Sequence, residues 1–187
     1  MFASKKIGKN ILNYFEDVNK KTYTCEQIVD SWDNVVDYTM EDLTKGRKGL
    51  RKAQLGAIFA IRAHWIISDE VSTIVMPTGT GKTETMITTI VAEQIKKTFI
   101  LVPSDLLRKQ TVSSCCKLGI LKEIGVINQC AKFPNVLLLK SLPQSTKELE
   151  KALYAANIIV STASLVSRFR DEYMSLLSDI CDVMVVD

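Results

Sequence analysis

A glycine-rich segment between an apolar run and a helical pattern is the feature that most restricts how this chain can fold. The apolar run covers residues 71–76, the segment after it contains Gly79 and Gly81, and a helical pattern extends over residues 82–95. The β-branched residues of the run predict a buried strand, and glycine permits the sharp turn that joins a strand to a helix. A strand, a tight loop and a helix in this order predict a domain of mixed α and β layers.

Further apolar runs repeat this alternation along the chain. Residues 98–102, 136–139, 157–160 and 183–186 are predicted as strands, and helical stretches lie mostly between them. Strands that alternate with helices form parallel sheets, because each crossover connection passes over a face of the sheet. The predicted fold is therefore α/β, with a parallel sheet that is covered by helices on both faces.

The first part of the chain has a helical pattern instead. Ile7, Ile11, Phe15 and Val18 recur at helical spacing, and residues 24–27 have the form of a capping box that opens a second helix. This second helix is predicted to be amphipathic as far as residue 43, with a solvated acidic face over the core or, alternatively, a face that binds a partner. The acidic face comprises Glu26, Asp30, Asp33, Asp37 and Glu41, and the apolar face comprises Ile28, Trp32, Val36, Met40 and Leu43.

A basic link that contains two glycines separates this region from the rest. It covers residues 45–49, and a long helical pattern follows over residues 50–66. Glycine clusters of this kind mark loops and boundaries. We therefore predict a helical N-terminal extension over residues 1–49 and an α/β domain over residues 50–187.

Composition excludes several classes of protein. The chain has 187 residues, of which 47% are hydrophobic and 24% charged, with a net charge of +3, as in an ordinary globular domain. Its five cysteines form no C-x-x-C pair, so neither a zinc site nor a disulfide framework is expected. Lys5, Lys6 and Lys9 interrupt the start of the chain before any apolar run, so we expect no signal peptide, no membrane partner and a cytoplasmic location.

The glycine-rich segment has the chemistry of a phosphate-binding loop. Gly79 and Gly81 allow successive backbone N–H groups to point at one anion, and the start of the following helix adds positive potential. Lys82 is placed to reach the β and γ phosphates of a nucleotide, and the Thr83 hydroxyl to bind magnesium. The segment therefore predicts binding of a nucleoside triphosphate with Mg2+, ATP in particular.

Other motifs decide which phosphate-binding family is involved. Residues 50–187 resemble the superfamily 2 helicases, in the group that includes the helicase subunit of type III restriction enzymes and the DEAD/DEAH-box proteins. This resemblance implies a P-loop NTPase domain with a RecA-like sheet. Arg51 and Gln54 resemble the glutamine motif that reads adenine, since an amide can donate to and accept from the base. Motif I of the family is matched by Pro77, Thr78, Gly79, Thr80, Gly81, Lys82, Thr83 and Glu84.

Two further motifs follow predicted strands. Residues 100–104, with Ser104 and Arg108, resemble motif Ia, and residues 158–165, with Thr162, resemble motif Ib. In the family these groups contact the sugar-phosphate backbone of a nucleic acid, which carries no sequence information. An ordinary helix cap is an alternative role for Ser104. The resemblance implies a nucleic-acid partner, DNA more than RNA.

Asp187 ends the strand that resembles the approach to motif II. The resemblance implies that Asp187 holds Mg2+ together with Thr83, and that Lys82 and Asp187 are catalytic. The family's water-orienting glutamate would follow Asp187, so residues 1–187 are expected to form an N-terminal part that binds ATP and barely hydrolyses it. The expected activity of the intact protein is that of an ATP-dependent helicase or translocase. Two alternatives remain: a double-strand DNA translocase that serves a restriction or defence nuclease, and a binding module that never hydrolyses its nucleotide.

Overall fold

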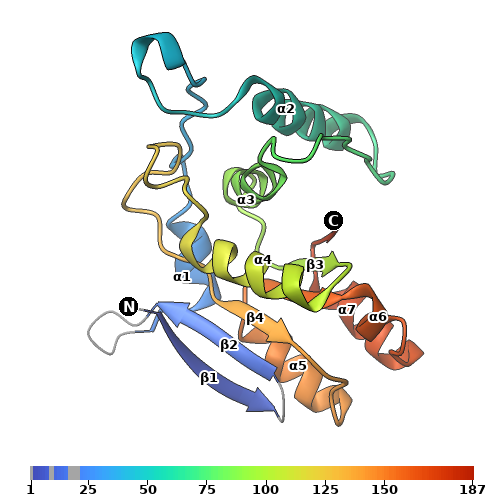
Figure 1. The fold of residues 1–187 in the computed structure, drawn as a ribbon. Coiled ribbons are helices and arrows are strands. Elements are labelled where there is room, and N and C mark those ends of the chain that lie inside the picture. The colour runs from blue at the N-terminus through green and yellow to red at the C-terminus, as the bar shows by residue number, and fades with distance from the viewer. Residues whose placement is uncertain (1, 9–10, 17–21) are drawn as a thin grey trace.

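The computed structural model describes residues 2–8, 11–16 and 22–187. These residues contain one sheet of six strands in the order β1-β2-β4-β5-β3-β6, with helices on its two faces (Figure 1). The strands are β1 (Phe2–Gly8), β2 (Ile11–Glu16), β3 (Thr98–Val102), β4 (Val136–Leu139), β5 (Ile158–Thr162) and β6 (Val183–Val186). The helices are α1 (Cys25–Asp30), α2 (Lys52–Ile67), α3 (Lys82–Ala92), α4 (Asp105–Lys117), α5 (Thr146–Tyr154), α6 (Ala163–Val166) and α7 (Asp171–Ile180), with a 3-10 turn η1 (Leu43–Lys45).

Strands β4, β5, β3 and β6 form an all-parallel sheet, which confirms the predicted α/β fold. β3 lies at its centre, paired with β5 on one side and with β6 on the other. The predicted strands at 98–102, 136–139 and 183–186 agree with β3, β4 and β6, and the one predicted at 157–160 is shifted slightly in β5. The register places Val102 beside Thr162, so the carboxyl ends of β3 and β5 lie together.

Alternate residues of the strands face two separate apolar cores. Phe99 and Ile159 pack in a cluster with residues of α5, α6 and α7, whereas Ile100 and Val160 pack in a cluster with residues of α1 to α4. Successive side chains of a strand point to opposite faces, so β3, β4 and β5 are buried on both faces, whereas Met184 and Val186 of the edge strand β6 are exposed. Figure 1 shows α4 and α5 on opposite sides of the strands.

The predicted helix through Ile7, Ile11 and Phe15 is wrong, because these residues lie in strands β1 and β2, which form a β-hairpin. β1 pairs antiparallel with β2, and β2 pairs antiparallel with β4, so the hairpin extends the sheet. A spacing of four residues, as between Ile11 and Phe15 in β2, fits a helix but is also an even number and therefore fits one face of a strand. Ile11 is 1% exposed in the sheet; Val18 lies outside the described residues.

The second predicted helix exists but is much shorter than expected. The capping box of Thr24 and Gln27 is present as predicted, yet α1 ends at Asp30 and no helix continues to residue 43. The Asp37 carboxylate accepts hydrogen bonds from the backbone N–H (2.9 Å) and hydroxyl (2.6 Å) of Thr39, a local bond that competes with helix formation. Asp37 also donates its own N–H to the Val126 carbonyl at 2.8 Å. The five acidic residues therefore do not share one helical face.

The predicted strand over residues 71–76 is not formed. Val71 is 94% exposed and Val75 is 90% exposed, and the segment leads to the glycine loop as irregular chain. A strand requires a neighbour for its backbone N–H and C=O groups. Among the described residues, none is bridged to residues 71–76, which belong to no strand of the sheet.

The remaining predicted helices are present. α2 agrees with the pattern at 50–66, and α3 begins at Lys82 as predicted, three residues shorter than expected at its end. The boundary at residue 49 stays a prediction. Of the helices described, none has both the length and the apolar character needed to cross a membrane.

Candidate functional site

The glycine loop turns sharply into the start of α3. Gly79 has φ +81° and Gly81 has φ +88°, and Gly81 is the residue that caps α3. The Thr80 hydroxyl donates to the Pro77 carbonyl at 2.6 Å and closes the turn. The first backbone N–H groups of a helix have no partner within it, so Lys82 and the residues after it present donors to an anion.

The start of α2 holds this loop by two side chains. Arg51 donates from Nη1 to the Gly79 carbonyl at 2.7 Å, and Gln54 donates from Nε2 to the Gly81 carbonyl at 3.2 Å. The Gln54 carbonyl also accepts from the Arg51 backbone N–H at 2.8 Å. The two residues of the predicted glutamine motif are therefore brought to the glycine loop, 27 and 28 positions away along the chain.

Gly81 is required both by conformation and by space. Its positive φ is unfavourable for residues that carry a side chain. A Cβ at this position would also overlap Nε2 of Gln54, which is 6% exposed and thus firmly placed. At Gly79, which shares the positive φ, a Cβ would meet no atom within 4 Å.

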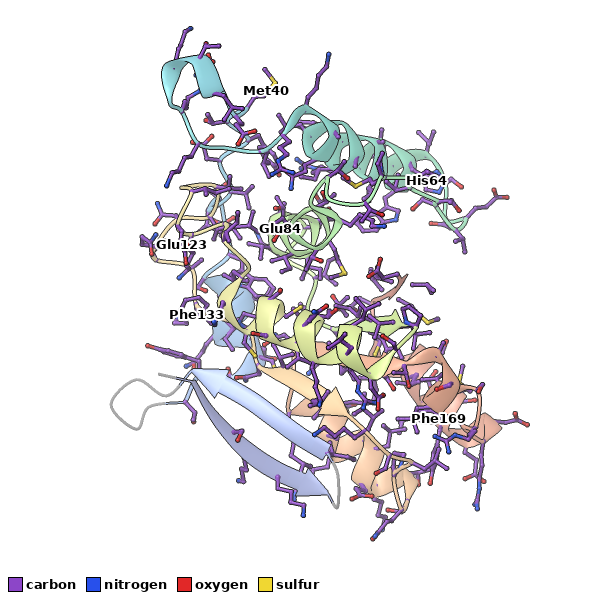
Figure 2. The ribbon with its side chains drawn as sticks, in the orientation of Figure 1. Met40, His64, Glu84, Glu123, Phe133 and Phe169 are labelled. Carbon is purple, nitrogen blue, oxygen red and sulfur yellow. The ribbon has the colours of Figure 1, made fainter. Side chains whose placement is uncertain are left out.

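The side chains after the loop differ in their surroundings. Lys82 is exposed, and its ammonium has no hydrogen bond or ion pair with any residue that the structure describes, so its charge is free for a ligand. Thr83 is half-buried on the first turn of α3. Glu84 lies on the same turn (Figure 2), near Gly119, where a Cβ would lie 3.5 Å from its Oε1.

Thr83 and Asp187 are the predicted magnesium ligands. Asp187 follows β6 at the carboxyl edge of the sheet, where its backbone N–H donates to the Leu101 carbonyl at 2.9 Å. No hydrogen bond or ion pair joins Asp187 to the glycine loop in the described part of the chain. That part also holds no cluster of three His, Cys, Asp or Glu side chains suited to a metal. Magnesium is commonly bound by one or two protein groups together with phosphate oxygens, so a hydroxyl beside a phosphate-binding helix start fits it.

The predicted nucleic-acid contacts Ser104 and Thr162 lie close together at the carboxyl edge. Ser104 is exposed and caps α4, with its Oγ accepting from the Leu107 N–H at 3.3 Å, as in the helix-cap interpretation. Thr162 is 4% exposed, and its Oγ lies 3.4 Å from that of the exposed Ser164. The register pairs Val102 with Thr162, so these two groups end neighbouring strands.

Arg108 is not at the surface, contrary to what its predicted contact requires. It is 4% exposed, donates from Nη1 to the Leu139 carbonyl at 3.0 Å, and pairs through Nη2 with Asp105 at 3.0 Å. The guanidinium fixes the end of β4 rather than presenting its charge to solvent.

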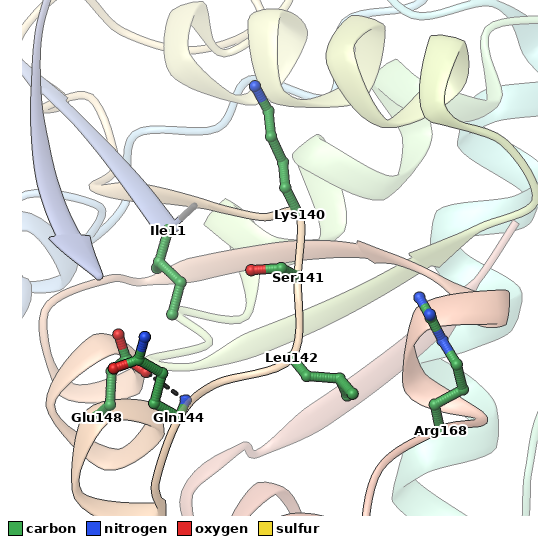
Figure 3. Close-up of a pocket in the computed structure, with 7 residues that line it drawn as sticks. All are labelled: Ile11, Lys140, Ser141, Leu142, Gln144, Glu148 and Arg168. Carbon is green, nitrogen blue, oxygen red and sulfur yellow. Dashed lines mark hydrogen bonds between the residues drawn. The ribbon is translucent and has the colours of Figure 1, made fainter. Parts of the chain in front are cut away.

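Sequence reasoning missed two cations at the same edge. Lys140 directly follows β4 and Arg168 follows α6, and both line a cavity of about 480 Å³ (Figure 3). Both residues lie outside the motifs, so only the position of Lys140 after a strand end could have indicated a role. The other lining residues are Ile11, Ser141, Leu142, Gln144 and Glu148.

Comparison with known proteins identifies the region that contains these features. A family model described as type III restriction enzyme, res subunit, matches residues 47–187. No curated protein matches the chain, and no solved structure matches it.

Proposed function

Because the chain belongs to the type III restriction enzyme res subunit family, with a helicase- or ATPase-like domain over residues 47–187, we propose that it forms the ATP-binding part of a DNA-dependent motor. The observation that carries this proposal is the joining of Arg51 and Gln54 to the backbone of the glycine loop. Two segments distant in sequence meet where a nucleotide would bind. The restriction-enzyme family supports a DNA context over RNA.

The roles follow from the geometry of the loop. The N–H groups at the start of α3 hold the phosphates, and the unpaired Lys82 ammonium supplies positive charge to the β and γ phosphates. The Thr83 hydroxyl and the Asp187 carboxylate would hold Mg2+, which would neutralise charge that develops on the transferred phosphoryl group. Glu84 shapes the loop from the first turn of α3.

Gln54 has the capacity that adenine requires. An amide offers two donor hydrogens and two acceptor lone pairs. One donor is used by Gly81 and one lone pair by the Arg51 N–H, so one of each remains for the base. Gln54 is only 6% exposed, so adenine reaches its amide only by packing closely against the start of α2. We propose that Gln54 therefore couples the identity of the base to the shape of the phosphate loop.

We propose that the exposed Ser104 begins a contact track for the nucleic-acid backbone, and that Thr162, which is 4% exposed, acts through the exposed Ser164 beside it. Both lie at strand ends on one edge of the sheet, and hydroxyl contacts to phosphate suit a motor that moves along any sequence. We assign Arg108 a positioning role at the end of β4, because its guanidinium is buried. Translocation on double-stranded DNA without strand separation, in partnership with a nuclease or defence subunit, is the second candidate, favoured by the restriction-enzyme family.

The proposal is tested by calorimetric titration of ATP with Mg2+ into the purified protein and its Lys82→Ala variant. We expect Lys82→Ala to weaken binding severely, because the phosphates lose the cation nearest to them. Lys96→Ala is the matched control, since Lys96 is exposed beyond the other end of α3. Equal ATP affinity for the native protein and Lys82→Ala would contradict the phosphate-loop assignment.

A further inference from the structure

The cavity beyond β4 carries two cations whose charge is not balanced. Lys140 is exposed, and no described residue forms an ion pair or hydrogen bond with its ammonium. Arg168 donates from Nε to the Ser164 carbonyl at 3.2 Å, which fixes its guanidinium without neutralising it. From this arrangement we propose that the cavity binds a backbone phosphate of the nucleic-acid strand, a proposal that rests on the proposed function.

The cavity continues the track formed by Ser104 and Thr162. Ser104 follows β3, Thr162 ends β5 and Lys140 follows β4, and these three strands are neighbours in the order β3, β5, β4. Parallel strands end at the same edge, so the three residues succeed one another across the sheet. A strand that passes Ser104 and Thr162 in that direction reaches Lys140 next.

The loop that carries Lys140 is anchored on both sides. Arg108 donates to the carbonyl of Leu139, the residue before Lys140, at 3.0 Å. Tyr173 donates its hydroxyl to the carbonyl of Pro143 at 3.1 Å in a buried contact. An anchored loop loses less backbone freedom when one of its side chains binds an anion. This explains why a buried arginine is found at the sheet edge.

The wall of the cavity includes a residue from outside the family match. Ile11 belongs to β2 of the N-terminal hairpin, whereas the family model begins at residue 47. The hairpin thus adds an apolar side to a site whose cations come from the matched domain. Binding at this cavity is therefore a property of this chain with its own N-terminal hairpin.

Glu148 makes one side of the cavity negatively charged. Its carboxylate accepts a hydrogen bond from the Gln144 backbone N–H, and Figure 3 shows the pair across the cavity from Arg168. A phosphate is repelled by this carboxylate and attracted by Lys140 and Arg168. The phosphate is therefore expected on the Arg168 side of the cavity, away from Glu148, where the long Lys140 side chain that extends toward α4 in Figure 3 supplies further positive charge. Glu148 limits the affinity.

The test measures binding of fluorescently labelled single-stranded DNA and RNA to the protein at several salt concentrations. The double variant Lys140→Gln, Arg168→Gln is expected to bind both polymers on the order of tenfold more weakly, because it removes both cations that attract the phosphate. The slope of log affinity against log salt is expected to fall by about 0.7 for each phosphate that the variant no longer neutralises. Glu148→Gln, which keeps the acceptor for Gln144, is expected to bind more tightly than the native protein.

Lys151→Gln is the control, because it removes one exposed positive charge on α5 away from the cavity lining. Each variant must first be shown to unfold at the same urea concentration as the native protein, as expected when the replaced side chains lie at the surface. A native salt slope in the double variant, or weaker binding confined to one polymer, would overturn the phosphate site while the proposed function stands. If the native protein binds neither polymer, it is the proposed function that fails.

Discussion

Replacement of Gly81 by alanine tests whether α2 contacts the phosphate loop as described. The left-handed conformation costs a residue with a side chain roughly 1–2 kcal/mol, and the stiffer unfolded chain returns about 0.4–1 kcal/mol. The new Cβ must also displace Gln54, which is 6% exposed and bonded to the Gly81 carbonyl. Loss of that bond with its donor left buried adds about 1–3 kcal/mol. We expect Gly81→Ala to lower the free energy of unfolding by about 2–3 kcal/mol.

Gly79→Ala separates the two contributions. Gly79 has φ +81°, close to that of Gly81, but a Cβ there meets no atom within 4 Å. It therefore carries the conformational cost alone, and we expect the free energy of unfolding to fall by about 1 kcal/mol. The assay is urea unfolding followed by tryptophan fluorescence, with Trp32, which is 1% exposed, as the buried reporter.

Gly81→Ala and Gly79→Ala are then compared again in a protein that also carries Gln54→Ala, which makes a double-mutant cycle. Without the Gln54 amide the added Cβ at position 81 has room, so the two alanine variants should become equally stable. Their ATP affinities should likewise converge. If Gly81→Ala and Gly79→Ala already cost the same in the native background, Gln54 does not pack on the loop, and the coupling of base to phosphate site is refuted.

Three further outcomes are expected. Gln54→Ala should narrow the difference in affinity between ATP and GTP, and equal affinities in the native protein would exclude base selection by Gln54. Any phosphate release from ATP that the native protein shows should be abolished by Lys82→Ala, because the γ phosphate loses the cation beside it; release at the native rate by this variant would exclude Lys82 from the reaction. Burial raises the pKa of the Cys116 thiol to about 12, so iodoacetamide at pH 8 should alkylate the exposed Cys130 while Cys116 reacts only after unfolding, as mass spectrometry of brief reactions can establish.

Short apolar runs were reliable predictors where the sheet is buried on both faces. Residues 98–102 and 136–139 agree with β3 and β4, which are buried almost throughout, and 183–186 agrees with the edge strand β6, where Met184 and Val186 are exposed. A strand with helices on both sides is apolar at every position, so its pattern is local and strong. The glycine loop was similarly predictable, because the spacing of Gly79, Gly81 and Lys82 depends on local backbone geometry and phosphate chemistry.

Where a sequence pattern fits both a helix and a strand, the local sequence did not decide which of the two forms. Ile11 and Phe15 have a spacing that suits a helix and a strand equally, and pairing of β2 with β4 selects the strand. The apolar run at 71–76 has the composition of a strand, yet none of the described residues is bridged to it. Backbone groups of a strand need a partner supplied by another segment, and composition does not report whether that partner is present.

The sequence by itself determined that a phosphate-binding loop starts a helix in a parallel α/β domain, because those signals lie within a few neighbouring residues. Only the tertiary structure decided which distant side chains serve it. It brought Gln54 to Gly81, buried Arg108 behind Leu139, and placed Lys140 and Arg168 around one cavity. Exposure and proximity depend on how strands and helices pack. Of two arginines, Arg168 is therefore exposed at the cavity, whereas Arg108 is buried and holds the end of β4.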